Sequence, residues 1–381
     1  MDRGSEMGTD GVVVESYSLD GALGVLAAVM SNSSSTRDTV RRNMRVREVA
    51  GVTTVVIKDP LRRIALNPAR KLNPWVSLAE FPWLIAGRCD VRWLLPYLPR
   101  AADFADDGRH WRAGYGPRLR DWGTSGVDQL AGVIRLLRSD PSTRQAVMSI
   151  WDPAADLGTH TKDMPCTNWL HFQSRQDEDG RLWLDLAVVM RSNDVIWGFS
   201  GVNVVNFTLL LELVARLTDM RVGVYRHIST NMHAYDRHFT MLRNINEAPT
   251  VDLMTLPLYP HNNLAGFTKE CRRVLEKVVE FREGILPEAP PPPSAWSHER
   301  WLGDWAYFMA LHPYRDRGAE WWADALHHVR DPAWRVAAAA YMVRRKPEFA
   351  PLLRRIIEGH GLCDDREVSG YMQATMEALS A

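Results

Sequence analysis

The sequence has few cysteines, no excess of charge of either sign and no long apolar run. Its four cysteines, Cys89, Cys166, Cys271 and Cys363, are too widely spaced for the paired motifs of zinc sites or disulfide frameworks. Lys and Arg number 46 and so do Asp and Glu, so the basic excess of nucleic-acid-binding proteins is absent. The first residues are acidic and polar, and no apolar run reaches membrane-spanning length. We therefore expect a cytoplasmic protein without a metal, acting on neither a nucleic-acid polymer nor a membrane.

The order of apolar patterns predicts a mixed fold. A chain of 381 residues, 46% of them hydrophobic, builds a sizeable core. Residues 204–217 are nearly all apolar, which is typical of a helix at the centre of a domain. Other helical spacings occur in 17–30, 78–86 and 126–137, and strand-like segments in 46–64, 145–151, 169–176 and 181–192. Since helices and strands do not alternate regularly, we expect an α+β fold, a mixed sheet packed with helices.

A proline run gives the clearest boundary. Residues 287–296 include four consecutive prolines, which favour an extended spacer. Beyond it, 297–381 is predicted to form a small all-helical C-terminal module, either for packing or for binding a protein partner. We therefore divide the chain into an N-terminal helix and loose segment (1–35), a catalytic domain (36–286), a Pro-rich linker (287–296) and a helical extension (297–381).

Chemically versatile residues follow one another in the middle of the chain. Pro165-Cys166 precedes a run from Arg191 through Ser192 to Asp194, and then come Asn203, His233 and Tyr235. Each has an ordinary explanation alone, such as a buried thiol, a surface ion pair or a loop cap. Together, in this order, they resemble the thymidylate synthase family over roughly residues 38–240. The resemblance implies that fold, and a pyrimidine nucleoside monophosphate and 5,10-methylenetetrahydrofolate as substrates.

Further positions match the family residue by residue. Glu80, Trp83 and Gly87 match its Glu-x-x-Trp-x-x-x-Gly, and Tyr115-Gly116 matches its Tyr-Gly. Its Asp-Pro-x-Ser-Arg segment puts an arginine at Arg144, which in the family reaches the partner subunit's phosphate site, so the resemblance implies a homodimer. Arg42 fits best as the N-terminal phosphate-binding arginine, with Arg41, Arg45 and Arg47 as competitors.

The chemistry of the family explains these residue types. Addition of the Cys166 thiolate to C6 makes C5 nucleophilic, and cationic neighbours favour the thiolate. By resemblance, Arg42, Arg144, Arg191 and Ser192 hold the phosphate, while His233 and Tyr235 hold the sugar. Asn203 would read the ring edge with its amide donor and acceptor. Glu80 and Tyr115 would assist catalysis, Glu80 as a proton relay. Asp194 would hold the pterin and also act in catalysis, with Trp83 and Gly198 on the folate side.

Several departures from the family concern the last step. The usual Trp-x-x-Trp pair becomes Ala101 and Phe104, the second arginine of the Arg-Arg pair becomes Gln145, and Thr167 follows the nucleophile where His is usual. Asn193 precedes Asp194, and the loop from Gly198 to Asn203 is one residue longer than usual. The proline stretch and helices follow where the family has a short closing tail. Hydride transfer needs water excluded, so these changes favour water as the reagent that quenches the exocyclic methylene.

We therefore predict a nucleotide hydroxymethylase, with a thymidylate synthase that forms a methyl group as the alternative. A non-catalytic nucleotide-binding member is a third hypothesis, which the retention of Cys166, Glu80 and the arginines argues against. The sequence leaves open uracil or cytosine, and deoxyribose or ribose, because an Asn side chain can flip to present the complementary edge.

Overall fold

Two sheets form the centre of the computed structural model, which describes residues 11–380 except 33, 42, 261–262 and 360–364. The six-stranded sheet has the order β1 (Val12–Ser16), β4 (Thr53–Ile57), β9 (Arg221–Ser229), β7 (Leu182–Met190), β6 (Thr167–Gln176) and β5 (Val147–Ser149). The four-stranded sheet has the order β2 (Thr36–Arg41), β3 (Met44–Val49), β10 (Met232–Tyr235) and β8 (Asn193–Asp194). Both parallel and antiparallel pairs occur, so the α+β prediction is confirmed.

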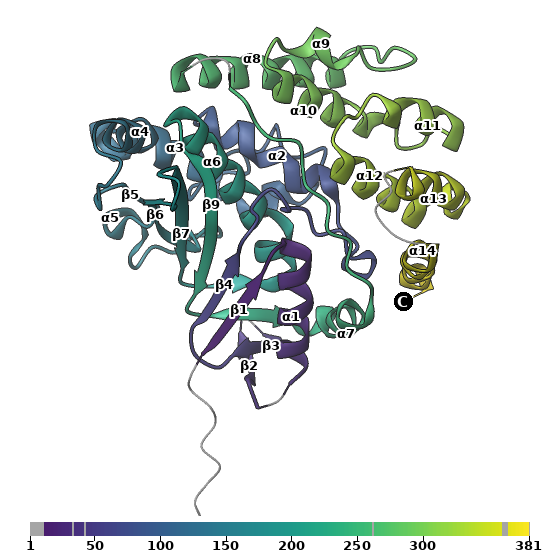
Figure 1. The fold of residues 1–381 in the computed structure, drawn as a ribbon, viewed down its shortest axis with the longest axis horizontal. Coiled ribbons are helices and arrows are strands. Elements are labelled where there is room, and N and C mark those ends of the chain that lie inside the picture. Colours follow the sequence, from purple (N-terminus) through teal and green to yellow (C-terminus); the bar gives the residue numbers. More distant parts are fainter. Residues whose placement is uncertain (1–10, 33, 42, 261–262, 360–364, 381) are drawn as a thin grey trace, which may run out of the picture.

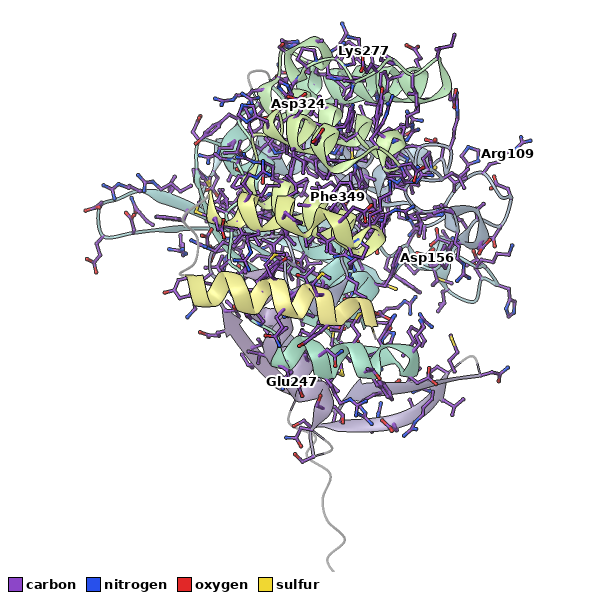
Figure 2. The ribbon with its side chains drawn as sticks, turned by 90° about the vertical axis from the view of Figure 1, so that its right-hand side faces the viewer. Arg109, Asp156, Glu247, Lys277, Asp324 and Phe349 are labelled. Atoms are coloured by element: carbon purple, nitrogen blue, oxygen red, sulfur yellow. The ribbon has the colours of Figure 1, made fainter. Side chains whose placement is uncertain are left out.

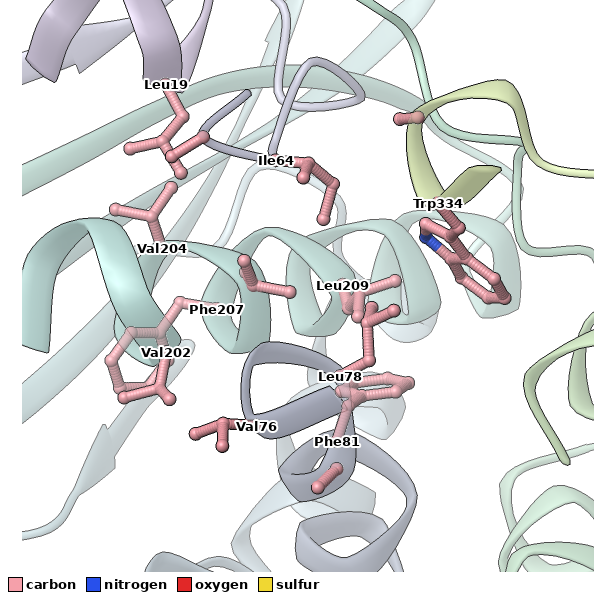
Figure 3. Close-up of a cluster of buried hydrophobic side chains, with 14 of the residues drawn as sticks. Leu19, Ile64, Val76, Leu78, Phe81, Val202, Val204, Phe207, Leu209 and Trp334 are labelled. Atoms are coloured by element: carbon pink, nitrogen blue, oxygen red, sulfur yellow. The ribbon is translucent and has the colours of Figure 1, made fainter. Parts of the chain in front are cut away.

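The central helices pack on one face of the larger sheet (Figure 1). These are α2 (Pro74–Ile85) and α6 (Val204–Leu217), with α1 (Leu19–Ser31), α3 (Tyr115–Arg120) and α4 (Gln129–Ser139) around them. The bounds of α6 agree with the prediction, and its residues are almost all buried, as the apolar run indicated. Figure 3 shows α6 crossing α2, with Leu209 facing Leu78 and Phe81. The expectation that no apolar run reaches membrane-spanning length is wrong for Val195–Leu217, which is apolar and long enough to cross a membrane, but 94% of its most apolar window is buried in this core.

The structure adds detail to the N-terminal third of the chain that the sequence did not predict. β1 precedes the N-terminal helix and pairs with β4. β2 begins directly after the segment 1–35 that was expected to contain a helix and loose chain, and it pairs with β3. The strand-like stretch 46–64 contains most of β3 and all of β4, and Gly51 turns the chain between them at a φ of 84°. α2 begins four residues earlier than expected, since Asn73 caps it and Pro74 occupies its first turn.

The C-terminal helices share the core of the sheet domain. After α5 (Pro153–Asp156), α7 (Phe239–Glu247) and α8 (Leu264–Glu283), the prolines are extended up to Pro292, and the chain turns into α9 (Pro293–Trp296). The remaining helices are α10 (Arg300–Ala310), α11 (Ala319–His327), α12 (Pro332–Arg345), α13 (Ala350–Glu358) and α14 (Asp365–Ser380). Figure 2 shows this side of the molecule, with Phe349 at the start of α13.

Indole hydrogen bonds fix these helices to α2. Trp305 Nε1 donates to the carbonyl of Leu78 at 2.8 Å, and Trp75 Nε1 donates to that of Phe308 at 2.9 Å. Trp75 also stacks on Phe308, with ring centroids 5.2 Å apart. Since Leu78 lies two residues before Glu80, the extension packs directly behind the helix that carries a predicted catalytic carboxylate.

Candidate active site

Cys166 lies immediately before β6, beside an arginine. Nη2 of Arg191 is 3.9 Å from Sγ of Cys166, and the same guanidinium donates to the carbonyl of Pro165 at 2.9 Å and of Met164 at 3.3 Å. The Arg191 backbone N–H also donates to the Cys166 carbonyl at 2.9 Å. A guanidinium this close favours the thiolate, the form that attacks carbon. The residue after β7 therefore places a cation beside the Cys166 thiol.

Hydrogen bonds on both sides of Cys166 join its segment to the start of α3. The backbone N–H of Ala113 donates to Asp163 Oδ2 at 2.9 Å, and the Tyr115 hydroxyl accepts from the backbone N–H of Thr167 at 3.2 Å. Tyr115 Oη and Thr167 Oγ1 are 3.0 Å apart. Burial raises the pKa of Tyr115, and the neighbouring Cys166 acts in the same direction. Tyr115 therefore stays a neutral hydrogen-bonding group beside Cys166.

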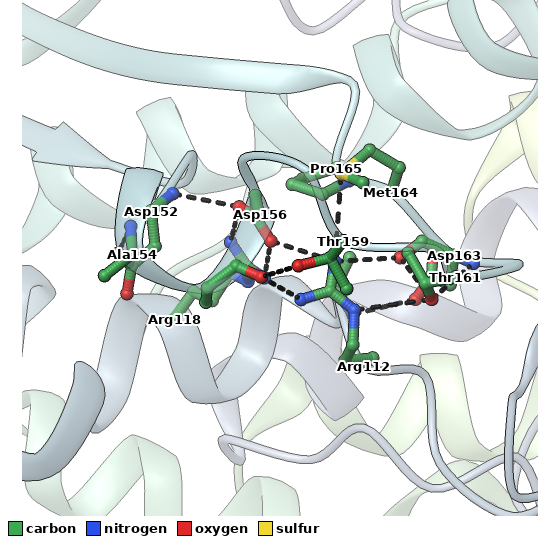
Figure 4. A network of polar contacts seen from close by, with 12 residues as sticks. Arg112, Arg118, Asp152, Ala154, Asp156, Thr159, Thr161, Asp163, Met164 and Pro165 are labelled. Carbon is green, nitrogen blue, oxygen red and sulfur yellow. Dashed lines mark hydrogen bonds and ion pairs between the residues drawn. The ribbon is translucent and has the colours of Figure 1, made fainter.

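A buried ion-pair network anchors the loop that leads to Cys166 (Figure 4). Asp156 accepts from Arg118 at 2.6 and 2.8 Å and from Arg112 at 2.9 Å. Arg112 also donates to the Asp163 carbonyl at 3.2 Å, so it spans the loop from α5 to the nucleophile. Guanidinium–carboxylate pairs of this kind restrict orientation as well as supplying charge.

Glu80 on α2 faces Asn206 on α6. Asn206 Nδ2 donates to Glu80 Oε2 at 2.7 Å. Burial raises the pKa of Glu80 to about 7, the bond from Asn206 opposes that rise, and the charge of Asp163 adds to it. A carboxyl with a pKa near 7 can both accept and donate a proton at neutral pH.

The extra residue of the loop before Asn203 is accommodated as a π-helix, η4 (Val195–Asn203). A π-helical turn absorbs one inserted residue, and such turns are frequent at functional sites. Asp194 caps η4, its Oδ1 accepting from the backbone N–H groups of Ile196 and Trp197 at 2.7 Å each. A Cβ at Gly198 would lie 2.9 Å from Nδ2 of Asn193 and 3.1 Å from Nδ2 of Asn203, so the glycine leaves room for both amides.

A buried arginine supports η4 from behind. Arg70, in η1 (Pro68–Arg70), donates to Ser200 Oγ at 2.8 Å and to the Ile196 carbonyl at 2.6 Å. Burial lowers the pKa of Arg70 to about 10, while the charge of Asp194 opposes the shift. Arg70 therefore fixes the helix that carries Asp194 at one end and Asn203 at the other.

The predicted sugar and phosphate residues meet where β8 and β10 pair. Ser192 Oγ lies 3.5 Å from His233 Nδ1, and the rings of His233 and Tyr235 are edge to face, with centroids 5.4 Å apart. His233 is paired in register with Asp194. These side chains form a polar strip that continues from Arg191.

The other predicted arginines differ in position. Arg144 is exposed, in the turn before β5. Arg42 lies outside the described residues. Its competitors are engaged in ion pairs: Arg41 with Glu48 at 3.1 Å, and Arg45 and Arg47 with Asp38 at 2.6 and 2.7 Å. Within one chain, Arg191 is therefore the predicted phosphate ligand that lies beside Cys166.

Three aromatic rings line the predicted folate side. Trp83 is buried and donates its Nε1 to the Asp90 carbonyl at 3.1 Å. Trp111 packs edge-on against Trp83, with centroids 5.8 Å apart, and Phe104 against Trp111 at 6.5 Å. Phe104 thus contributes to an aromatic wall, as the missing Trp-x-x-Trp pair would, but its partner is Trp111.

A carboxylate oxygen of Asp194 suits the N–H groups of a pterin ring. Asp194 Oδ2 is buried and has no hydrogen-bond partner among the described residues, so it can accept from a ring N–H. Among those residues no group of three His, Cys, Asp or Glu side chains could hold a metal ion.

Comparison with known proteins assigns the family. The thymidylate synthase family model matches residues 23–273, about two thirds of the chain. The chain belongs to the thymidylate synthase family. This member is 38% identical over 266 residues to the deoxyuridylate hydroxymethyltransferase of Bacillus phage SP01, covering 64% of the chain and 68% of that protein. It is 39% identical over 207 residues to the enzyme of the same name from Pseudomonas phage M6, covering 54% of the chain and 56% of that protein. Against a third, from Delftia phage PhiW-14, it is 33% identical over 190 residues, covering 47% of the chain and 50% of that protein.

Sequence reasoning missed four residues of this family member's site: Arg70, Trp111, Asp163 and Asn206. Trp111 and Asp163 had a usable signal, since they lie four and three residues before Tyr115 and Cys166. Asn206 lies three residues after Asn203, on the same side of a helix. Arg70 had no signal, because its partners lie 126 and 130 residues away.

Proposed function

We propose that this protein hydroxymethylates C5 of deoxyuridine 5'-monophosphate, with 5,10-methylenetetrahydrofolate as carbon donor. The observation that carries the proposal is the 3.9 Å approach of the Arg191 guanidinium to the Cys166 thiol. It supplies a nucleophile and a phosphate ligand side by side. The names of the phage relatives support both the deoxyuridylate substrate and the hydroxymethyl product.

In the proposed reaction each residue has a defined task. Arg191 binds the phosphate and favours the Cys166 thiolate, which adds to C6 of the ring. Asn203 hydrogen-bonds the ring edge, and Ser192 and His233 bind the phosphate and sugar side. The folate supplies the carbon at the oxidation level of formaldehyde, and Asp194 holds its ring. Glu80 takes the C5 proton and passes it to the folate nitrogen that leaves, so it is ionised again when it takes the proton of the water.

The polar surroundings of Glu80 favour water as the quenching reagent. Asn206 bonds to Glu80, and the charge of Asp163 raises the pKa of Glu80 further. Hydride transfer requires a dry site, whereas carboxyl and amide groups around the reacting carbon retain water.

The test is to incubate the protein with the nucleotide and the folate, then analyse both by mass spectrometry. We expect a nucleotide that has gained CH₂O and a folate released as tetrahydrofolate. A nucleotide that has gained CH₂ together with dihydrofolate would identify a methyl-forming enzyme instead. Parallel reactions with dCMP, UMP and CMP test the base and the sugar. Cys166→Ala should abolish turnover, whereas the matched Cys89→Ala should not, since burial raises the pKa of the Cys89 thiol.

We also propose a homodimer that shares Arg144. The outer face of the six-stranded sheet carries Val13, Val147 and Trp169, which are 71%, 44% and 38% exposed. Exposed apolar side chains on one sheet face are typical of an interface. Arg144 is exposed three residues before Val147, at the edge of that face.

Mixing two inactive variants tests the shared site. Cys166→Ala and Arg144→Ala homodimers should both be inactive, whereas subunit exchange should restore activity in mixed dimers that contain one intact site. Absence of complementation in dimers shown to have exchanged would contradict the sharing of Arg144. A cytoplasmic location is also proposed, because a thiolate nucleophile is protected from oxidation there.

A further inference from the structure

Asn206 has two polar ends with different surroundings. Its Nδ2 donates to Glu80 Oε2 at 2.7 Å. Its Oδ1 is buried and has no hydrogen-bond partner among the described residues, and the whole residue is only 4% exposed. Leaving a buried amide oxygen without a donor is costly, so such an atom normally serves a water molecule or a ligand.

Asn206 lies near the residue that is predicted to read the ring edge. Asn206 lies three residues after Asn203 in a continuous helical segment, so both amides lie on one side of it. Because an amide is planar and Nδ2 is engaged by Glu80, the direction of Oδ1 is fixed as well. The hydroxymethyl-forming step needs one water molecule held beside a base, and a buried water needs at least two polar partners.

We propose that Asn206 is a positioning residue of the quenching step, holding Glu80 with its N–H and the attacking water with its Oδ1. This inference rests on the proposed function and identifies the residues that hold the water of the hydroxymethyl-forming step. The oxygen of the water adds to the exocyclic methylene carbon, and its proton passes to the Glu80 carboxylate. The electron pair of the exocyclic double bond moves into the C4 carbonyl. That pair then re-forms the C5–C6 double bond and expels the Cys166 thiolate from C6.

The experiment separates the early steps from the quench. In 5-fluoro-dUMP, fluorine replaces the C5 proton, so the nucleotide stops as a covalent adduct on Cys166 before water is needed. Asn206→Leu keeps the size of the side chain and removes both polar ends. We expect this variant to form the adduct at a rate close to that of the wild type, while hydroxymethyl product forms about a hundredfold more slowly.

An added thiol provides a second readout. In Asn206→Leu the exocyclic methylene should persist long enough for 2-mercaptoethanol to capture it as a thioether at C5, detected by mass spectrometry. Thr208→Val is the matched control. Thr208 is buried on the same helix, and its hydroxyl bonds the Val204 carbonyl at 2.6 Å. The control should retain the wild-type ratio of hydroxymethyl product to thioether.

Asn206→Asp tests the proposal if the leucine variant does not fold. The aspartate is isosteric, but its charge opposes ionisation of Glu80, so the limb of the pH–rate profile should move to higher pH. Wild-type turnover in Asn206→Leu, or an unmoved limb in Asn206→Asp, would overturn the role of Asn206. If the wild-type protein forms no hydroxymethyl nucleotide, the proposed function fails, and that result does not depend on either variant.

Discussion

Asp156 offers a test of how the fold positions the nucleophile. The substitution Asp156→Asn keeps the size of the side chain and removes its charge. In the native protein this carboxylate is fully buried, and its partners Arg118 and Arg112 are 10% and 27% exposed. The variant would leave the Arg118 guanidinium largely buried without its counter-ion, which is the costly way to break such a pair.

Two independent arguments give the loss of stability expected for Asp156→Asn. Burial alone would raise the pKa of Asp156, but the bonds from Arg118, the Asp152 backbone and Arg112 outweigh that effect and lower it from 3.8 to about 2. Such a fall corresponds to about 2.5 kcal/mol of stability at neutral pH, and solvent screening of the more exposed Arg112 reduces it to about 2 kcal/mol. Removing one partner of a buried pair costs about 3–5 kcal/mol. We therefore expect a loss of about 2–4 kcal/mol.

The assay is urea unfolding at fixed protein concentration, with the rate of Cys166 alkylation as a local probe. Asp103→Asn is the control, since the Arg100–Asp103 pair is 78% and 57% exposed and should contribute under about 1 kcal/mol. Because the pKa of Asp156 is lowered, its contribution is complete above pH 3.8 and is lost as the pH falls through about 2. A change in unfolding free energy below about 0.5 kcal/mol for Asp156→Asn would refute the reasoning.

Three further predictions concern the site and its support. Because burial raises the pKa of Glu80 to about 7, its base form exists mainly above that pH, and initial rates of turnover should decrease as the pH falls below 7. Glu80→Gln should remove this pH dependence together with most of the activity. Arg70→Met should lower the free energy of unfolding by about 2–4 kcal/mol, since Ser200 and the Ile196 carbonyl lose their donor. The same variant should discriminate less well between dUMP and dCMP. Unchanged selectivity would mean that η4 keeps its shape without Arg70. Trp305→Ala should lower the free energy of unfolding by about 3–5 kcal/mol, because a buried indole and its bond to the Leu78 carbonyl are lost together. A much smaller decrease in denaturant unfolding would show that the C-terminal helices contribute little to the core.

The fold was predictable where a pattern is long and local. The central helix 204–217 was predicted because its residues are nearly all apolar, and β6 and β7 because each is a long strand-like segment. β8 and β10 contain two and four residues, too few for a period to be recognised. The π-helix was visible in the sequence only as an insertion of one residue, and periodicity does not reveal which helical geometry accommodates an insertion.

The site was predictable only as far as family motifs extend. Cys166, Arg191 and Asp194 belong to short motifs whose residue types reflect their chemistry. The bond between Glu80 and Asn206 joins residues 126 positions apart, and nothing local to either residue indicates its partner. The same holds for Arg70, since a buried arginine between two short segments has no sequence pattern of its own.

The C-terminal helices are connected to the active site through the segment between β4 and α2. Tyr371 on α14 donates to the Leu66 carbonyl at 2.8 Å, and Arg344 on α12 donates to the Leu72 carbonyl. These contacts hold both ends of the stretch that contains Arg70, and Arg70 in turn holds η4. Trp305 fixes α2 two residues before Glu80. The C-terminal helices therefore stabilise α2 and η4, the elements that carry Glu80 and Asn203. Loss of these helices would shift both elements and so change the geometry of the site, although no residue of the helices themselves is predicted to touch substrate.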